Sequence, residues 1–253
     1  MSNSPVMSPN GINHLALASS DIKKTLQFFN QVLGMPLASL YWMHGVENTI
    51  HGFISLNEHS LLAFVSNPKI TKEVTFGITH SGNPGDTCAG GTMQHVAFNV
   101  NNLDDLLAIR DRVRSKGLHC MGPMDHGMMQ SIYFAGPDNM TLEVAFLTGV
   151  DPRKWIDPTA VEHVGISMEE LEELKNPKPF SRPSEPVTNP SLEEGNKEYR
   201  MHWPGAYEML MTTPDDILVD ILKDNVPPTE ATDPDKIQKG SLKDQIEKAL
   251  SDN

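Results

Sequence analysis

The chain has 253 residues, enough for a substantial hydrophobic core and for one large domain or two small ones. Its formal net charge of -13 disfavours binding to nucleic acid or to an anionic membrane surface. Two cysteines, Cys88 and Cys120, give no disulfide framework, and the N-terminus lacks the basic and apolar pattern of a secretion signal. We therefore expect a soluble cytoplasmic protein.

A strand followed by a helix is predicted at the start of the chain. The strand covers residues 12–18, and Ser19-Ser20-Asp21 then supplies N-cap residues. Apolar residues recur at helical spacing from Ile22 to Leu33, and Gly34 ends the pattern. Three strands are expected after the helix, at about residues 37–43, 50–56 and 61–65.

The same order of elements returns in the next part of the chain. A strand is predicted at 94–100, a helix from Leu103 to Lys116, and three strands at about 118–121, 130–135 and 141–147. The chain therefore contains an internal repeat, with a first copy at about residues 11–66 and a second at about 92–148. Residues 67–91 join the copies and are too many for a simple turn, so they form either a functional loop or an insertion.

Residues 149–253 form an irregular extension in which prolines interrupt regular structure. Short helices are predicted at 167–175 and 240–250. Aromatic residues, among them Trp155 and Trp203, indicate that part of the extension packs on the protein, whereas its last ~20 residues are expected to be mobile.

Two histidines occupy equivalent positions in the two repeats. His14 shares one face of its predicted strand with Ala16, and His95 shares one face of its strand with Ala97. Glu143 lies within the last predicted strand of the second repeat, where an isolated carboxylate would be costly to bury without a metal or a partner. A single histidine in a strand is commonly an ordinary core or surface residue, so the equivalence of the two positions is what favours a metal site.

These three side chains do not determine which metal would bind. Two imidazoles and one carboxylate, with the other coordination positions free, are typical of non-haem Fe(II) oxygenases. The same donors suit catalytic zinc, and Mn(II) fits a site of similar hardness.

Three further residues have both a functional and an ordinary interpretation. His59 precedes the last strand of the first repeat and is either a surface turn residue or a general base, because an imidazole exchanges protons near neutral pH. Tyr133 is either a core tyrosine or part of the face that carries Glu143. His126, in the loop before that strand, either orients a substrate or is an exposed turn histidine.

Residues 10–148 resemble the vicinal oxygen chelate superfamily, the group of glyoxalases, bleomycin-resistance proteins and dioxygenases. The resemblance implies an α+β fold in which paired βαβββ repeats form a cup-shaped mixed sheet around a metal. Within the group the chain is most similar to type I extradiol ring-cleaving dioxygenases. Their metal ligands correspond here to His14, His95 and Glu143.

The resemblance also implies roles around the metal. It assigns an acid/base role to His59, which lies in the segment Asn57-Glu58-His59-Ser60-Leu61-Leu62-Ala63-Phe64. The tyrosine that precedes the ligand glutamate in these enzymes corresponds to Tyr133. A substrate-binding histidine corresponds to His126. Asp138-Asn139 replaces the acid-Gly turn that is usual in these enzymes.

The leading hypothesis is an Fe(II)-dependent dioxygenase that cleaves a catechol-like diol with O₂, as in aromatic compound catabolism, and that forms a homo-oligomer, with a dimer favoured. The rivals are a glyoxalase-like isomerase or lyase and a metal-free small-molecule binding protein of the same fold. A glyoxalase-type site generally takes a fourth protein ligand from the first repeat, and aligning the last strands of the repeats puts Leu62 opposite Glu143. Since leucine cannot bind a metal, the alignment favours the dioxygenase.

Overall fold

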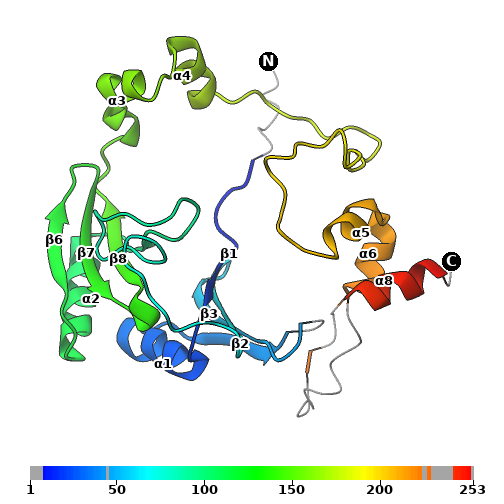
Figure 1. The fold of residues 1–253 in the computed structure, drawn as a ribbon. Coiled ribbons are helices and arrows are strands. Elements are labelled where there is room, and N and C mark those ends of the chain that lie inside the picture. Colours follow the sequence, from blue (N-terminus) through cyan, green and yellow to red (C-terminus); the bar gives the residue numbers. More distant parts are fainter. Residues whose placement is uncertain (1–7, 44–45, 224–226, 229–241, 252–253) are drawn as a thin grey trace. The chain divides into compact units, whose positions relative to one another are not determined.

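The computed structural model describes residues 8–43, 46–223, 227–228 and 242–251. The chain divides into a larger compact unit, Met1–Ser39 with Gly52–Phe180, and a smaller one, Leu40–His51 with Ser181–Asn253. Among the helices of the described residues, none combines the length and the apolar character needed to cross a membrane. The predicted repeats are both present, and each begins in the larger unit (Figure 1).

The first repeat runs in the predicted order of strand, helix and three strands. Its elements are β1 (His14–Ala18), α1 (Ile22–Leu33), β2 (Leu37–Trp42), β3 (Ile50–Asn57) and β4 (Ser60–Ser66). The Asp21 side chain caps α1 by accepting a hydrogen bond from the amide of Lys24, and Gly34 ends the helix in the left-handed conformation. The sequence therefore predicted both ends of this helix correctly.

The second repeat has the same order of elements. They are β5 (Val96–Asn99), α2 (Leu103–Ser115), β6 (Met121–Asp125), β7 (Met129–Ala135), the 3₁₀ turn η1 (Pro137–Asn139) and β8 (Thr141–Leu147). The side chain of Asn102 caps α2 by accepting from the amide of Asp105. The expected strand at 118–121 was placed too early, because β6 continues through Pro123 to Asp125.

The described strands form two four-stranded mixed sheets, ordered β1-β4-β3-β2 and β5-β8-β7-β6. The first strand of each repeat pairs in parallel with the last one, β1 with β4 and β5 with β8. The common order confirms the internal repeat and the α+β class.

The pairing register corrects the alignment of the two repeats. Ala16 is opposite Ala63 in the first repeat, whereas Ala97 is opposite Glu143 in the second. The residue equivalent to Glu143 is therefore Ala63 and not Leu62, which belongs to the opposite face and to the buried core. The conclusion drawn from Leu62 survives the correction, since alanine has no metal-binding group either.

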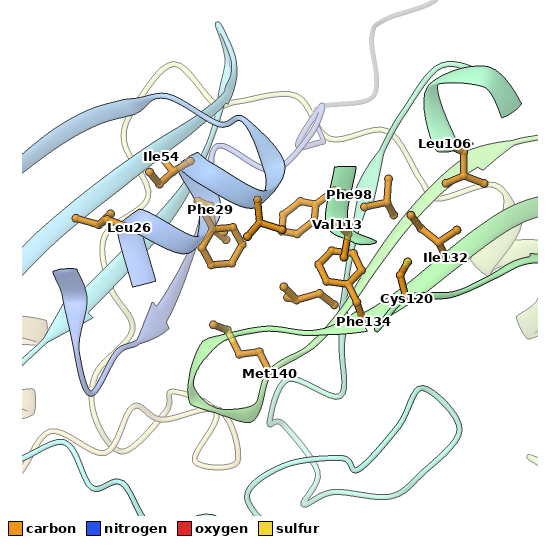
Figure 2. Packing of buried hydrophobic residues seen from close by; sticks show 14 of the residues in the cluster. Leu26, Phe29, Ile54, Phe98, Leu106, Val113, Cys120, Ile132, Phe134 and Met140 are labelled. Atoms are coloured by element: carbon orange, nitrogen blue, oxygen red, sulfur yellow. The ribbon is translucent and has the colours of Figure 1, made fainter. Parts of the chain in front are cut away.

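The two repeats share a hydrophobic core in which α1 and α2 pack together. Phe29 of α1 is fully buried, and its ring centroid lies 5.0 Å from that of Phe64 and 6.2 Å from that of Phe98. Figure 2 shows Phe29 and Phe98 within one cluster that continues to Ile132 and Phe134. The core leaves the other face of β1 exposed, at His14, Ala16 and Ala18.

The extension begins with η2 (Pro152–Trp155), α3 (Pro158–His163) and α4 (Met168–Lys175) in the larger unit. The smaller unit holds α5 (Tyr207–Thr212), α6 (Asp215–Ile221) and α8 (Leu242–Ser251), where Leu210 and Ile246 are buried. The helices predicted at 167–175 and 240–250 are confirmed. Half of the segment expected to be mobile, residues 234–241 and 252–253, lies outside the described ranges, and the other half is α8.

Candidate metal centre

Four side chains of the second repeat form one line of contacts around Glu143, whose side chain is almost fully buried. His95 Nε2 lies 2.9 Å from Glu143 Oε2, and the Tyr133 hydroxyl donates to Glu143 Oε1 at 3.1 Å. His126 Nε2 in turn lies 3.0 Å from the Tyr133 hydroxyl. Both oxygens of the buried carboxylate are therefore engaged.

The sheet register explains why these residues meet. Tyr133 of β7 is directly opposite Glu143 of β8, and Ala97 of β5 is opposite Glu143 on its other side. His95 lies two residues before Ala97, immediately ahead of β5, and so projects to the same face. The predicted shared face of Tyr133 and Glu143 is confirmed by this pairing.

The turn between β6 and β7 brings His126 to Tyr133. The amide of His126 donates to the carbonyl of Met129 at 2.9 Å, and the amide of Gly127 donates to Asp125 Oδ1 at 2.7 Å. These bonds fix the backbone on both sides of the imidazole. His126 is thus an exposed turn histidine, as its ordinary interpretation expected, and its imidazole also contacts Tyr133.

Burial raises the pKa of Tyr133 above its ordinary value, and the negative charge of Glu143 and the hydrogen bond to it act in the same direction. The phenol therefore keeps its proton at neutral pH and donates it in the hydrogen bond to Glu143. Because that proton is already donated, the contact with His126 requires His126 Nε2 to be the donor and the Tyr133 oxygen the acceptor.

His14 is not brought into this line of contacts. It is the first residue of β1 and lies on the exposed face of the strand. Its Nδ1 is 2.9 Å from Asn13 Oδ1, and its ring meets that of Phe53 at a centroid distance of 5.8 Å. Within the described ranges, no three His, Cys, Asp or Glu side chains lie close enough together to hold a metal ion. His14 as the third ligand stays a prediction.

His59 also lies apart from Glu143. It occupies the turn between β3 and β4, its side chain is 84% exposed, and its Nε2 is 3.2 Å from Glu58 Oε1. The turn lines a hollow of about 710 Å³ together with residues 10–13. The general-base role of His59 rests on the resemblance and stays a prediction.

The donor chemistry at His95 and Glu143 fits a divalent cation. Imidazole nitrogen and carboxylate oxygen are the donors that Fe(II), Mn(II) and Zn(II) share. A buried carboxylate also needs a positive or hydrogen-bonding partner on each oxygen, and a cation at Oε2 would meet that need. The residues that could hold a metal in this repeat are therefore His95 and Glu143.

Sequence comparisons find relatives with two kinds of chemistry in their names. The chain is 27% identical to a "Probable lactoylglutathione lyase" of Synechocystis sp. over 134 residues, which cover 52% of this chain and 91% of that protein. It is 26% identical to "Biphenyl-2,3-diol 1,2-dioxygenase 3" of Rhodococcus globerulus over 145 residues, 57% of this chain and 67% of that protein.

Among solved structures, the chain is similar to a glyoxylase/bleomycin resistance protein/dioxygenase domain from Frankia sp. EAN1pec. The TM-score is 0.46 at 14% identity, over 55% of this chain and 99% of that one. The model of one family matches residues 11–144, which span both repeats. The chain therefore belongs to the Glyoxalase/Bleomycin resistance protein/Dioxygenase superfamily.

Proposed function

We propose that the protein is an Fe(II)-dependent extradiol dioxygenase that opens the ring of a catechol-like diol. The observation that carries the proposal is the line of contacts from His126 through Tyr133 to Glu143 and His95. It sets a neutral phenol and a second imidazole directly beside the carboxylate and imidazole proposed as ligands. A dioxygenase acting on a biphenyl diol is also among the named relatives.

In this proposal His95, Glu143 and His14 hold the metal. A bound Fe(II) would supply a shared coordination sphere for the diol and for dioxygen, so that the two react as neighbours. The overall reaction breaks one carbon–carbon bond of the ring beside the diol. Both oxygen atoms of O₂ enter the ring-opened product, and no further reductant is needed.

Tyr133 has the role of a hydrogen-bond donor to the substrate. Its hydroxyl now donates to Glu143 Oε1, and a substrate oxygen placed beside the carboxylate would compete for the same proton. His126 donates to the Tyr133 oxygen and thereby polarises the hydroxyl, which makes it a better donor. The raised pKa of Tyr133 keeps that proton on the phenol throughout the neutral range.

His59 is proposed as the group that accepts a proton from the diol. Its imidazole is exposed, and its Nε2 lies 3.2 Å from Glu58 Oε1. The role follows from the resemblance of the segment around His59 to that of the ring-cleaving dioxygenases.

A metal-dependent lyase is the second candidate, because a lactoylglutathione lyase is among the relatives. A site of that type generally takes a fourth protein ligand from the last strand of the first repeat. The equivalent residue is Ala63, which has no donor atom. This single difference favours the dioxygenase.

The test is anaerobic reconstitution of the full chain with Fe(II), followed by oxygen-uptake and absorbance measurements against a panel of catechols. We expect oxygen consumption matched by a ring-opened product. Glu143→Gln should abolish it, whereas Glu169→Gln, an exposed glutamate of α4, should leave it unchanged. In a parallel assay with methylglyoxal and glutathione, formation of lactoylglutathione without oxygen uptake would assign the protein to the lyases. Metal binding with neither activity would overturn both proposals.

A further inference from the structure

Residues 67–91, which link the two repeats, are hydrogen-bonded to the chain close to two of the candidate metal ligands, His95 and Glu143. Ser81 is buried, and its hydroxyl donates to the carbonyl oxygen of Gln94, directly ahead of His95. The hydroxyl of Thr141, two residues ahead of Glu143, donates to the carbonyl oxygen of Ser81 at 3.3 Å. The linking segment is thus attached to each side of the His95–Glu143 pair.

The side chain of Gln94 is held by the same segment. Its Nε2 donates to the carbonyl oxygens of Asn83, at 3.1 Å, and Asp86, at 3.0 Å. An amide nitrogen carries two protons, and both are used in these bonds. The amide is therefore orientated with its oxygen away from the carbonyls, and that oxygen contacts His95 Nδ1.

This contact determines which nitrogen of His95 can bind a metal. Gln94 Oε1 has no proton to give, so the hydrogen bond requires a proton on His95 Nδ1. The other nitrogen, Nε2, is then left to the carboxylate, 2.9 Å from Glu143 Oε2, where a bound metal would replace the hydrogen that Nε2 donates to that oxygen. The ring is thus presented with its metal-binding nitrogen towards the carboxylate.

We propose that Gln94 is a positioning residue that fixes the ring orientation and the tautomer of His95, and that the linking segment 67–91 acts on the metal site through it. The proposal rests on the proposed function in one respect, the role of His95 as a metal ligand. Partners of this kind strengthen metal binding because the ligand is already orientated before the metal arrives, and their loss typically costs about 10- to 100-fold in affinity.

The experiment measures metal affinity and the histidine tautomer separately in the full chain. The metal is Zn(II) or Co(II), titrated against a chromophoric chelator. Gln94→Ala should weaken binding by about 10- to 100-fold. Gln94→Glu should weaken binding less than Gln94→Ala, because its carboxylate still accepts from Nδ1 although it loses both hydrogen bonds to the carbonyls of Asn83 and Asp86. Gln31→Ala, an exposed glutamine of α1, is the control and should have no effect.

The second measurement is the nitrogen NMR spectrum of the histidine rings in the metal-free protein, with His95→Asn to assign the signal. We expect His95 to be protonated at Nδ1 in the wild type and to lose that preference in Gln94→Ala. Wild-type affinity in Gln94→Ala, equal weakening by both Gln94 variants, or a wild-type His95 without a proton on Nδ1 would each overturn the proposal. If the wild type binds no divalent metal, the proposed function fails, while the tautomer still tests the role of Gln94.

Discussion

Tyr133 and Glu143 are directly opposite each other on the antiparallel strands β7 and β8, and the tyrosine hydroxyl donates to the carboxylate at 3.1 Å. The two residues are not neighbours in the sequence, and the pairing of β7 with β8 brings them together. The bond links the buried carboxylate to His126 and so joins two strands and a turn into one site.

The raised pKa of Tyr133 gives a prediction for alkaline pH. Its proton is bound more tightly in the folded than in the unfolded chain, so the resulting stability is present below the usual value near 10 and is lost as the pH rises through the folded value. In the metal-free protein, ultraviolet difference spectra should contain a tyrosine titration step above the usual range. That late step should be absent from Tyr133→Phe, and its persistence there would contradict the assignment.

Gly127, in the turn that carries His126, is packed under an aromatic ring of the extension. Its φ is +79°, and an added Cβ would lie 2.3 Å from Trp155 Cζ2. Gly127→Ala should therefore displace the indole and destabilise the protein by about 1–3 kcal/mol beyond the cost of the left-handed backbone. The measurement is denaturant unfolding together with tryptophan fluorescence.

Gly149→Ala is the control for that substitution. Gly149 has a similar φ of +85°, but nothing lies within 4 Å of an added Cβ. It should show only the backbone cost, about 1–2 kcal/mol. Equal losses of stability in the two variants would mean that the contact with Trp155 contributes nothing.

Asp138 joins the two repeats through Ser20. The amide of Ser20 donates to Asp138 Oδ2 at 3.1 Å, and its hydroxyl donates to Oδ1. Hydrogen bonds to a charged acceptor are worth about 1.5–3 kcal/mol, so Asp138→Asn should lower the free energy of unfolding by about that amount. A double-mutant cycle with Ser20→Ala should give a coupling energy of about 0.5–3 kcal/mol, and purely additive losses would contradict the link.

The two cysteines should differ in reactivity. Cys120 is buried, and burial raises the pKa of its thiol, so little of the reactive thiolate forms at neutral pH. Cys88 is partly accessible. A chromogenic disulfide reagent should thus modify one thiol quickly and the second only on unfolding. Cys88→Ser should remove the fast phase, and a fast phase that survived would have to come from Cys120.

His59→Ala tests the proton-accepting role. The substitution should leave the affinity for metal unchanged and lower the rate of catechol cleavage by about 10²- to 10⁴-fold. His163→Ala, an exposed histidine at the end of α3, is the control and should have no effect. Undiminished turnover in His59→Ala would remove this residue from the mechanism.

Local signals in the sequence were sufficient for the helices of both repeats. Asp21 and Gly34 mark the ends of α1 through a cap and a left-handed residue, which depend only on neighbours in the chain. Strand β6 lies later than predicted and contains Pro123. Proline is tolerated at the edge of a sheet and at an irregularity, and β6 is an edge strand with a shift of register between Met121 and Met124.

The sequence predicted only the part of the site that follows from the alternation of residues along a strand. Alternation along two strands placed Tyr133 and Glu143 on one face, and the pairing bears this out. The position of His14 depends on the arrangement of one sheet against the other, which periodicity does not encode. Gln94 had no signal at all, because its partners are carbonyl groups of residues 83 and 86, and every residue type has a carbonyl group.

At the position of Ala63, the first repeat lacks the carboxylate that Glu143 supplies in the second. An alanine codon becomes a glutamate codon by a change of one base, so a single mutation would place a carboxylate opposite Ala16, as Glu143 is opposite Ala97. In the proposed site, that change separates a three-donor metal centre from a four-donor one. A family that uses the same duplicated scaffold for ring cleavage and for lyase chemistry could thus move between them without rebuilding its backbone.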